Sequence, residues 1–382
     1  MKILHTVDLY APSIGGSQEV VRQISEHLVS LGHDVTVATG FIPGRNSKKI
    51  SGVKIKEFNI TGNLVVGLKG EIDNYQKFVL NGKFDVVLNY AAQSWSTDAL
   101  VEILPTISAK KLFVPCGFSG LKHPAFAEYY RSILKWIKEY DAIVFTSKYY
   151  QDYEYVSKYL KKNMQIIPNG AGELEFENLN KNNDYLREKL NIPFQDKVIL
   201  TVSSHVHSKG HKESIAIFRA SKIQNATLLI VGNSFADSEC TDSCNLSASK
   251  YNHSIFRRFD SKQVIVRDLT RIDTVNAFSM ADIFLFPSKI ECAPLVIYEC
   301  LAAGLPFISS SSGNVKEIVK NTNAGIVMRD IHDGAKQLAS LLLDHDRLAQ
   351  MSNCGRKYWN KYSRWDLITQ KYEKLYKKLT KV

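Results

Sequence analysis

The 382-residue sequence has no run of 18 or more apolar residues, which is about the length that a membrane-spanning helix requires. Its first residues, MKILHTVDLY, carry one lysine and only a short apolar stretch, so they predict a first β-strand and not a signal peptide. These two features predict a cytoplasmic protein that does not cross a membrane.

Cysteine is also scarce, and the six cysteines, at 116, 240, 244, 292, 300 and 354, lack the spacing of a disulfide scaffold. This pattern is typical of a reducing compartment. Cys240 and Cys244 form a C-x3-C pair with only His253 close in sequence, so a four-ligand zinc site would lack a member. We interpret the pair as structural or incidental. The histidine-rich segment 205–211 has metal-compatible spacing, but we predict neither a metal nor another cofactor.

Basic charge is unevenly distributed. The formal net charge is +11, and the last 27 residues, 356–382, hold nine basic and two acidic side chains. Trp365, Ile368, Tyr372 and Leu375 recur there at helical spacing, which predicts a basic amphipathic helix. A lysine-rich face suits weak contact with an anionic membrane surface, although a solvated helix face is the commoner case. Without a base-stacking motif, we do not predict nucleic-acid binding.

Short apolar strands alternate with helical patterns along both halves of the chain. The predicted strands are 2–7, 34–39, 53–58, 86–89, 112–114, 142–146, 198–203, 227–231, 263–266, 283–286 and 307–308. Such alternation predicts an α/β protein with two doubly wound parallel sheets. We predict an N-terminal domain at 1–172, a second domain at 173–360 and the basic helix at 361–382. The polar run 173–183 is the predicted linker, and 233–252 is predicted to be a long polar loop.

A Pro-Ser-Ile-Gly-Gly loop, residues 12–16, joins the first strand to the first helix. It lacks the G-x-G-x-x-G order of a dinucleotide-binding fingerprint. The adjacent glycines, Gly15 and Gly16, nevertheless allow a ligand to approach the backbone closely. A tight turn without a ligand is the alternative interpretation.

A second loop and helix begin after the apolar strand 283–286. Pro294 is expected at the first turn of this helix, where its missing N–H has no cost. The next N–H groups, those of Leu295 and Val296, would face whatever lies in front of the helix. Oriented N–H groups and the helix dipole together favour phosphate.

Two carboxylates flank that helix start, Glu291 in the loop and Glu299 within the apolar helix sequence. A buried charge is costly without partners, so Glu299 is expected to have a specific one. Carboxylates accept hydrogen bonds from hydroxyl groups, and phosphate together with hydroxyls suggests a sugar nucleotide. Two solvated glutamates on a surface helix are the alternative interpretation.

The segment ADIFLFPSKIECAPLVIYECLAAGLPFISSSSGNVKEIV, residues 281–319, resembles the E-x7-E region of retaining family 4 glycosyltransferases. The resemblance implies the GT-B architecture: two Rossmann-like domains facing a cleft, the first binding the acceptor and the second the nucleotide-sugar donor. It further implies that the C-terminal helix crosses back to the first domain.

The resemblance also assigns roles to individual residues. Lys209 matches the lysine that contacts the donor diphosphate, Glu291 the glutamate that holds the donor sugar, and Glu299 the one that holds the ribose. Lys209 and Glu291 are the predicted catalytic residues. The predicted donor-binding residues are Gly15, Gly16, Lys209, Glu291, Leu295, Val296 and Glu299.

Several positions depart from the family pattern. Ala293 and Pro294 replace the usual aromatic residue and glycine. Ser204 stands where members usually carry an arginine, and Cys116 and Asn89 stand where many carry a histidine. Two hypotheses follow. The chain is a retaining transferase that moves a sugar from a nucleotide-diphosphate sugar to a glycan or lipid-linked acceptor in surface polysaccharide or glycolipid synthesis. Alternatively, it is a catalytically silent GT-B subunit that binds or scaffolds a partner transferase.

Overall fold

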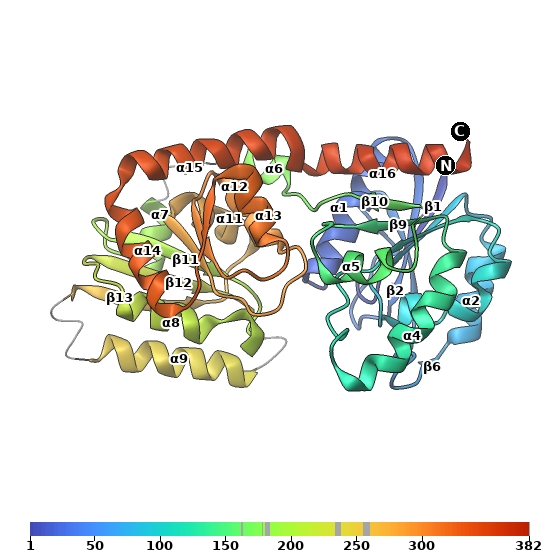
Figure 1. Cartoon of the computed structure of the whole chain (residues 1–382), viewed down its shortest axis with the longest axis horizontal. Helices are drawn as coiled ribbons and strands as arrows, with labels where there is room; N and C mark the ends of the chain where they lie inside the picture. The colour runs from blue at the N-terminus through green and yellow to red at the C-terminus, as the bar shows by residue number, and fades with distance from the viewer. Residues whose placement is uncertain (162, 178, 180–183, 234–237, 255–259, 382) are drawn as a thin grey trace. The chain divides into compact units, whose positions relative to one another are not determined.

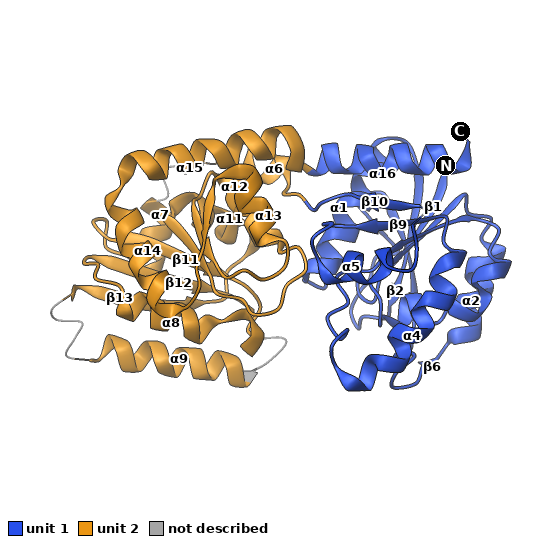
Figure 2. Ribbon diagram, in the orientation of Figure 1, with its two compact units in different colours: residues 1–169, 365–382 blue, residues 170–364 orange. Residues whose placement is uncertain are grey.

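The structure, a computed structural model, describes residues 1–161, 163–177, 179, 184–233, 238–254 and 260–381. The chain forms two compact units, which Figure 2 colours blue and orange. Unit 1 comprises Met1–Asn169 and Trp365–Val382, and unit 2 comprises Gly170–Arg364. The divisions predicted from the sequence lie a few residues away, after 172 and after 360.

Unit 1 is built on an eight-stranded sheet with strand order β10-β9-β8-β7-β1-β2-β4-β3. Neighbouring strands are parallel except for β3 and β4. Its strands are β1 (Lys2–Thr6), β2 (Asp34–Gly40), β3 (Lys49–Ile50), β4 (Val53–Phe58), β7 (Val86–Tyr90), β8 (Lys110–Val114), β9 (Ala142–Phe145) and β10 (Met164–Ile166), with β5 (Ile60–Thr61) and β6 (Lys69–Gly70) as a separate antiparallel pair.

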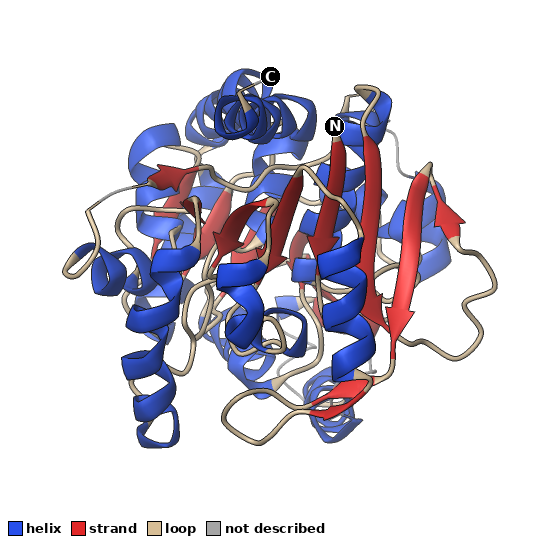
Figure 3. Cartoon of the chain, turned by 90° about the vertical axis from the view of Figure 1, so that its right-hand side faces the viewer, coloured by secondary structure: helices blue, strands red, loops and turns tan. Residues whose placement is uncertain are grey.

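Helices surround this sheet, as Figure 3 shows in its view of unit 1. They are α1 (Gly16–Ser30), α2 (Ile72–Asn81), α3 (Trp95–Asp98), α4 (Ala127–Trp136), α5 (Gln151–Ser157) and α16 (Trp365–Thr380), with 3₁₀ turns at Val101–Thr106, Pro124–Phe126 and Ile137–Glu139. Strand β7 is buried at every position, as expected for a parallel strand with both faces covered.

The C-terminal helix α16 belongs to unit 1 and packs against α1. Its apolar side chains Trp365, Ile368 and Tyr372 are buried. Tyr376 extends this buried face, and its hydroxyl hydrogen-bonds the buried ring of His5 on β1 at 3.1 Å. The predicted return of the last helix to the first domain is therefore confirmed.

Unit 2 contains a wholly parallel six-stranded sheet in the order β13-β12-β11-β14-β15-β16. Its strands are β11 (Lys197–Val202), β12 (Ala226–Val231), β13 (Lys262–Arg267), β14 (Ile283–Phe286), β15 (Phe307–Ser309) and β16 (Gly325–Val327). Its helices, labelled in Figure 1 where there is room, are α6 (Glu173–Phe176), α7 (Asp184–Leu190), α8 (His211–Ala220), α9 (Ser238–Asn252), α11 (Arg271–Met280), α12 (Leu295–Ala303), α13 (Val315–Thr322), α14 (Ile331–Leu343) and α15 (His345–Tyr358), with a 3₁₀ turn at His207–Lys209 and a π-helical turn at Trp359–Ser363. Two doubly wound parallel sheets are thus present, as predicted.

Two segments of unit 2 differ from the prediction. The start of the predicted linker 173–183 forms α6, and Phe176 is fully buried in the core of unit 2. Residues 178 and 180–183 of the predicted linker lie outside the described residues. Most of the predicted polar loop 233–252 is the helix α9, whose buried residues are Cys240, Cys244, Ala248 and Tyr251. These side chains recur at helical spacing, but they are small or carry a polar group, so the apolar pattern of the helix is weak.

Candidate active site

The chain order reverses direction across the sheet of unit 2 between β11 and β14. Strands β12 and β13 continue on one side of β11, whereas β14 pairs on its other side. Ligands of doubly wound sheets bind at such a switch point, outside the carboxyl ends of the strands. The loop after β11 carries Lys209, and the loop after β14 carries Glu291.

These two loops are held together by their backbones. Gly210 has φ of +77°, and a Cβ atom there would lie 2.3 Å from the carbonyl oxygen of Pro287, so both conformation and space require glycine. The N–H of Lys289 donates to the carbonyl of Ser208 at 2.8 Å. The close fit brings Lys209 to the Glu291 loop.

Lys209 and Glu291 form an ion pair. Lys209 Nζ lies 2.8 Å from Glu291 Oε1, and the Ser288 hydroxyl donates to the same oxygen at 2.7 Å. The lysine side chain is 28% exposed and the glutamate 9%, so the ammonium group remains within reach of a ligand. A cation beside a carboxylate can bind a phosphate oxygen and a neighbouring hydroxyl at the same time.

Helix α12 begins directly after this loop. Pro294 is its N-cap with an extended backbone, and the helix starts at Leu295, one residue later than the sequence predicts. The N–H groups of Leu295 and Val296 occupy the first two helical positions, which no carbonyl of the same helix can reach. The helix dipole adds partial positive charge at this end. Both features favour an anionic ligand.

Glu299 lies in the second turn of α12, where it is largely buried and pairs with Arg271 of α11. Arg271 NH2 is 2.6 Å from Glu299 Oε1, and the same guanidinium makes two bonds to Glu175, at 2.7 and 2.8 Å. Burial alone would lower the pKa of Arg271, but the two carboxylates raise it above its ordinary value. The expected partner of Glu299 is therefore a residue of the chain itself.

Arg271 was not among the site residues predicted from the sequence. One signal was available, because Arg271 is the first residue of α11, after the N-cap Thr270. A cation at a helix N-terminus opposes the helix dipole, so an arginine there suggests a nearby carboxylate.

Gly15 and Gly16 belong to unit 1, whereas the residues described above belong to unit 2. Gly15 is the N-cap of α1 and Gly16 its first residue. A Cβ atom on Gly16 would meet nothing within 4 Å. Close packing therefore does not explain why this position is glycine, and its proposed role stays a prediction.

Cys116 follows β8 in an unusual backbone conformation. Cys116, Gly117 and Phe118 all have positive φ, at 58°, 100° and 51°, a region that costs energy for non-glycine residues. The Asp152 carboxylate accepts the Gly117 N–H at 2.9 Å and so supports this turn. Asn89, by contrast, is fully buried and uses its amide to bond Thr6 and Tyr140. Hydrogen bonding within the core of unit 1 therefore accounts for the asparagine at this position.

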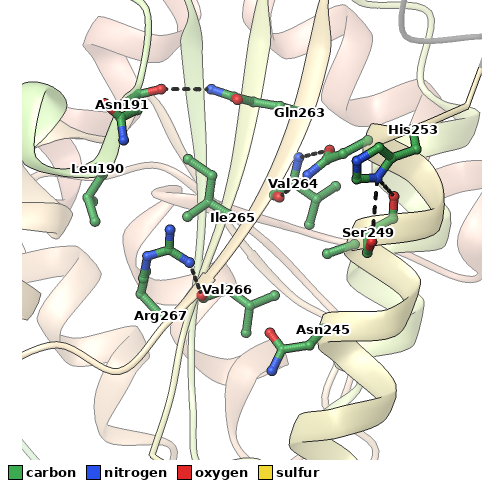
Figure 4. Close-up of a pocket in the computed structure, with 12 residues that line it drawn as sticks. Leu190, Asn191, Asn245, Ser249, His253, Gln263, Val264, Ile265, Val266 and Arg267 are labelled. Carbon is green, nitrogen blue, oxygen red and sulfur yellow. Dashed lines mark hydrogen bonds between the residues drawn. The ribbon is translucent and has the colours of Figure 1, made fainter.

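A pocket between α9 and β13 contains none of the predicted donor-binding residues (Figure 4). His253 follows α9, is exposed and lines the pocket, and its Nδ1–H donates to the Ser249 carbonyl oxygen at 2.8 Å. Gln263 bonds the Asn191 carbonyl across the pocket. We therefore do not assign this pocket to the donor.

Two family models match the chain. Residues 14–171 match the model described as Glycosyltransferase Family 4, and residues 182–358 match Glycosyl transferases group 1. Together these matches support a glycosyltransferase similar to those of family 4. Its two units, with the GT-B fold, correspond to the two models.

Individual relatives are distant or matched only in part. A GDP-mannose-dependent alpha-(1-6)-phosphatidylinositol monomannoside mannosyltransferase of Mycobacterium tuberculosis is 32% identical over 102 residues, 24% of this chain and 26% of that protein. The N-acetyl-alpha-D-glucosaminyl L-malate synthase of Bacillus anthracis is 22% identical over 98% of this chain and 97% of its own length. The structure of HepE from Anabaena, solved with UDP and glucose, superposes with a TM-score of 0.77 at 14% identity, covering 98% of this chain and 99% of HepE.

Proposed function

We propose that this glycosyltransferase moves a sugar from a nucleotide-diphosphate sugar to a glycan or lipid-linked acceptor, with retention at the anomeric carbon. The observation that carries the proposal is the Lys209–Glu291 pair at the switch point of unit 2, next to the N-terminus of α12. The matches to the two glycosyltransferase family models also support it.

In this reaction the bond from the anomeric carbon to the diphosphate breaks as a bond to the acceptor oxygen forms. Negative charge then accumulates on the leaving nucleotide diphosphate. Lys209 and the N–H groups of Leu295 and Val296 are fixed donors that would stabilise this charge, which is commonly the largest catalytic term. The proton of the acceptor hydroxyl passes to the phosphate oxygen that is released from the anomeric carbon, or to water.

Glu291 and Glu299 would accept hydrogen bonds from donor hydroxyls. Glu291 is held by Ser288 as well as by Lys209, so its orientation is set before a ligand binds. Glu299 is held by Arg271. We propose that Arg271 positions Glu299 for the ribose, leaving the remaining carboxylate lone pairs for hydroxyl groups.

The phosphate-binding side has one lysine where the family usually has an arginine as well. Ser204, at the arginine position, carries no cation, and the hydroxyl of its neighbour Ser203 bonds His211 at 2.9 Å. A buried arginine–phosphate contact is strong and bidentate. Restoring it with Ser204→Arg is expected to raise turnover if the enzyme is active, or to create turnover in a silent subunit.

The deciding experiment is a panel of UDP-, GDP- and dTDP-sugars. The panel includes UDP and GDP forms because HepE was solved with UDP and the Mycobacterium relative is named as GDP-mannose-dependent. We expect one donor to raise the melting temperature of the protein and to be hydrolysed or transferred. If the donor is α-linked, NMR of the product should show an α-configured anomeric carbon. Binding without turnover would favour the silent-subunit hypothesis. A panel in which nothing binds would refute the proposal.

We also propose weak contact with an anionic membrane, in keeping with a lipid-linked acceptor. Within the described residues, no helix is both long and apolar enough to cross a bilayer. The apolar face of α16 is buried in unit 1, so contact would be electrostatic, through its exposed lysines. Those lysines are Lys371, Lys374, Lys377 and Lys378. Flotation with anionic vesicles should fall when all four are changed to Gln, and flotation that is unchanged would exclude this contact.

A further inference from the structure

Four metal-ligating side chains from separate segments meet inside unit 2. His205 lies in the loop after β11, His211 begins α8, and Cys240 and Cys244 lie on α9. Their ligand atoms are all within 4.8 Å of one another, and all four residues are buried. Helices α8 and α9 lie side by side in unit 2 (Figure 1). Sequence spacing hides this cluster, because C-x3-C is completed by residues about thirty positions upstream, and not by the nearby His253.

The ring of His211 sits between a cysteine and a hydroxyl. Its Nδ1 atom is 4.0 Å from Cys240 Sγ, and its Nε2 atom is 2.9 Å from Ser203 Oγ. A ligating histidine usually donates its other N–H to such a partner, which fixes the ring and its tautomer. His211 is therefore arranged to ligate through Nδ1 while Nε2–H donates to Ser203.

The backbone leaves room for the second imidazole. The rings of His205 and His211 are stacked, with centroids 4.5 Å apart. Gly232, just after β12, lies against His205, and a Cβ atom there would be 3.2 Å from His205 Nε2 and 2.2 Å from the Ser203 carbonyl oxygen. A side chain at Gly232 would clash with the Ser203 backbone and crowd the His205 ring.

We propose that His205, His211, Cys240 and Cys244 form a tetrahedral site for Zn²⁺ or a similar thiophilic divalent ion. Two thiolates and two imidazoles are a common structural zinc set, with metal–ligand distances of about 2.0–2.3 Å. Such a tetrahedron separates its ligand atoms by roughly 3.3–3.8 Å, so the cluster needs to contract by about 1 Å at its widest. Sulfur ligands select against Mg²⁺ and Ca²⁺. On binding, each thiol gives up its proton to solvent.

The site would have a structural task. With four protein ligands it has no open position for a catalytic water. Two of the ligands, His205 and His211, bracket Lys209 in the sequence, and the other two belong to α9. The ion would therefore fasten α9 to the loop that carries Lys209. The metal site itself does not depend on the proposed transferase activity.

Cobalt binding to the full-length chain tests this proposal directly. The protein is reduced, stripped with a chelator and titrated with Co²⁺, and Zn²⁺ is then added. We expect one Co²⁺ per chain, with thiolate-to-cobalt charge-transfer absorption and the strong visible bands of tetrahedral cobalt, both lost when Zn²⁺ displaces it. Zn²⁺ should also raise the melting temperature by several degrees. Absence of the thiolate band from folded, reduced protein would overturn the proposal, because the two cysteines would then be buried side chains without a metal.

Matched variants locate the site. Cys244→Ser and His205→Asn are each expected to abolish stoichiometric binding, whereas Cys354→Ser and His253→Asn, outside the cluster, should bind as the parent does. Ser203→Ala should weaken zinc binding by roughly 10- to 100-fold, as loss of such an orienting partner usually does. Circular dichroism without metal checks that each variant is folded. If Cys244→Ser is folded and still shows the thiolate band, or if the controls lose it, the assignment is wrong. If a cluster variant does not fold, the spectrum of the parent protein decides.

Discussion

The two units treat their buried titratable groups differently. In unit 2 the groups around the switch point are charged and paired, Lys209 with Glu291 and Arg271 with Glu299. In unit 1 the buried Arg45 is likewise paired, with Glu57, but three other buried groups are held towards their neutral forms. Burial lowers the pKa of His5 to about 3 and raises that of Asp98 and of Asp152 to about 6.

The difference shows where an ionic ligand can be accommodated. In unit 2 a phosphate or hydroxyl can exchange with an existing ion pair, so little new charge must be desolvated when the ligand binds. In unit 1 the carboxyl of Asp98 is satisfied by the Tyr129 hydroxyl and the Leu64 N–H, and a further charge there would have to be buried at a cost. The comparison predicts that ionic chemistry depends on unit 2 and that unit 1 contributes shape and neutral contacts.

The largest effect is expected for Lys209→Ala. Loss of one fixed donor to a developing negative charge typically lowers kcat by about 100- to 1,000-fold. Turnover with the donor found by the panel measures it. Lys212→Ala is the matched control, because Lys212 is an exposed lysine three positions away on α8. A loss below threefold in Lys209→Ala would break the comparison, since the ion pair would then be structural only.

A smaller loss is expected for Glu299→Gln. The amide keeps the size of the side chain but removes the charge that strengthens its hydrogen bonds, worth about 1.5–3 kcal/mol, or roughly 10- to 100-fold in kcat/KM. Thermal unfolding must accompany the kinetics, because the partial loss of the Arg271 pair also lowers stability. Glu188→Gln, an exposed site on α7, serves as control. If Glu299→Gln loses stability but retains kcat/KM, Glu299 only holds Arg271 in place.

Gly16→Ala tests the contribution of unit 1. The methyl group meets nothing within 4 Å, so stability should not fall. If a ligand approaches this backbone, the methyl group would displace it by about an ångström and lower activity by about tenfold or more. Kinetics and a melting curve together separate these effects, and Ser17→Ala, which adds no atoms at the same end of α1, is the control. Unchanged activity would indicate that Gly16 serves only the turn and that no ligand approaches its backbone.

The sequence predicted what is encoded locally. The strand, loop and helix around Glu291 and Glu299 lie in one continuous stretch, so spacing alone placed both carboxylates beside the start of α12. Contacts between distant segments were not predictable in this way. Arg271 reaches Glu299 from another helix, and His205 meets Cys244 only because α9 folds against α8. The helix α9 itself was missed because cysteines occupy much of its buried stripe, where a pattern search looks for leucine or valine.

The smallest effect concerns the neutral histidine of unit 1. His5 bonds Ser25 at 2.8 Å and Tyr376 at 3.1 Å, and its pKa falls from 6.5 to about 3 on burial. The unfolded chain therefore binds a proton between these values while the folded chain does not, so this contribution to stability is present above pH 6.5 and is lost as the pH falls.

His5→Gln should be less stable than the parent at pH 7 because of lost packing. The difference should shrink by about 1 kcal/mol between pH 6.5 and 5.5, as measured by urea unfolding at each pH. Comparing the two proteins cancels the opposite titration of Asp98 and Asp152, which favours the folded state as they take up protons below about pH 6. A difference that stays constant with pH would mean that folding leaves the pKa of His5 unchanged, and the contrast with the charged groups of unit 2 would fail at this fully buried residue.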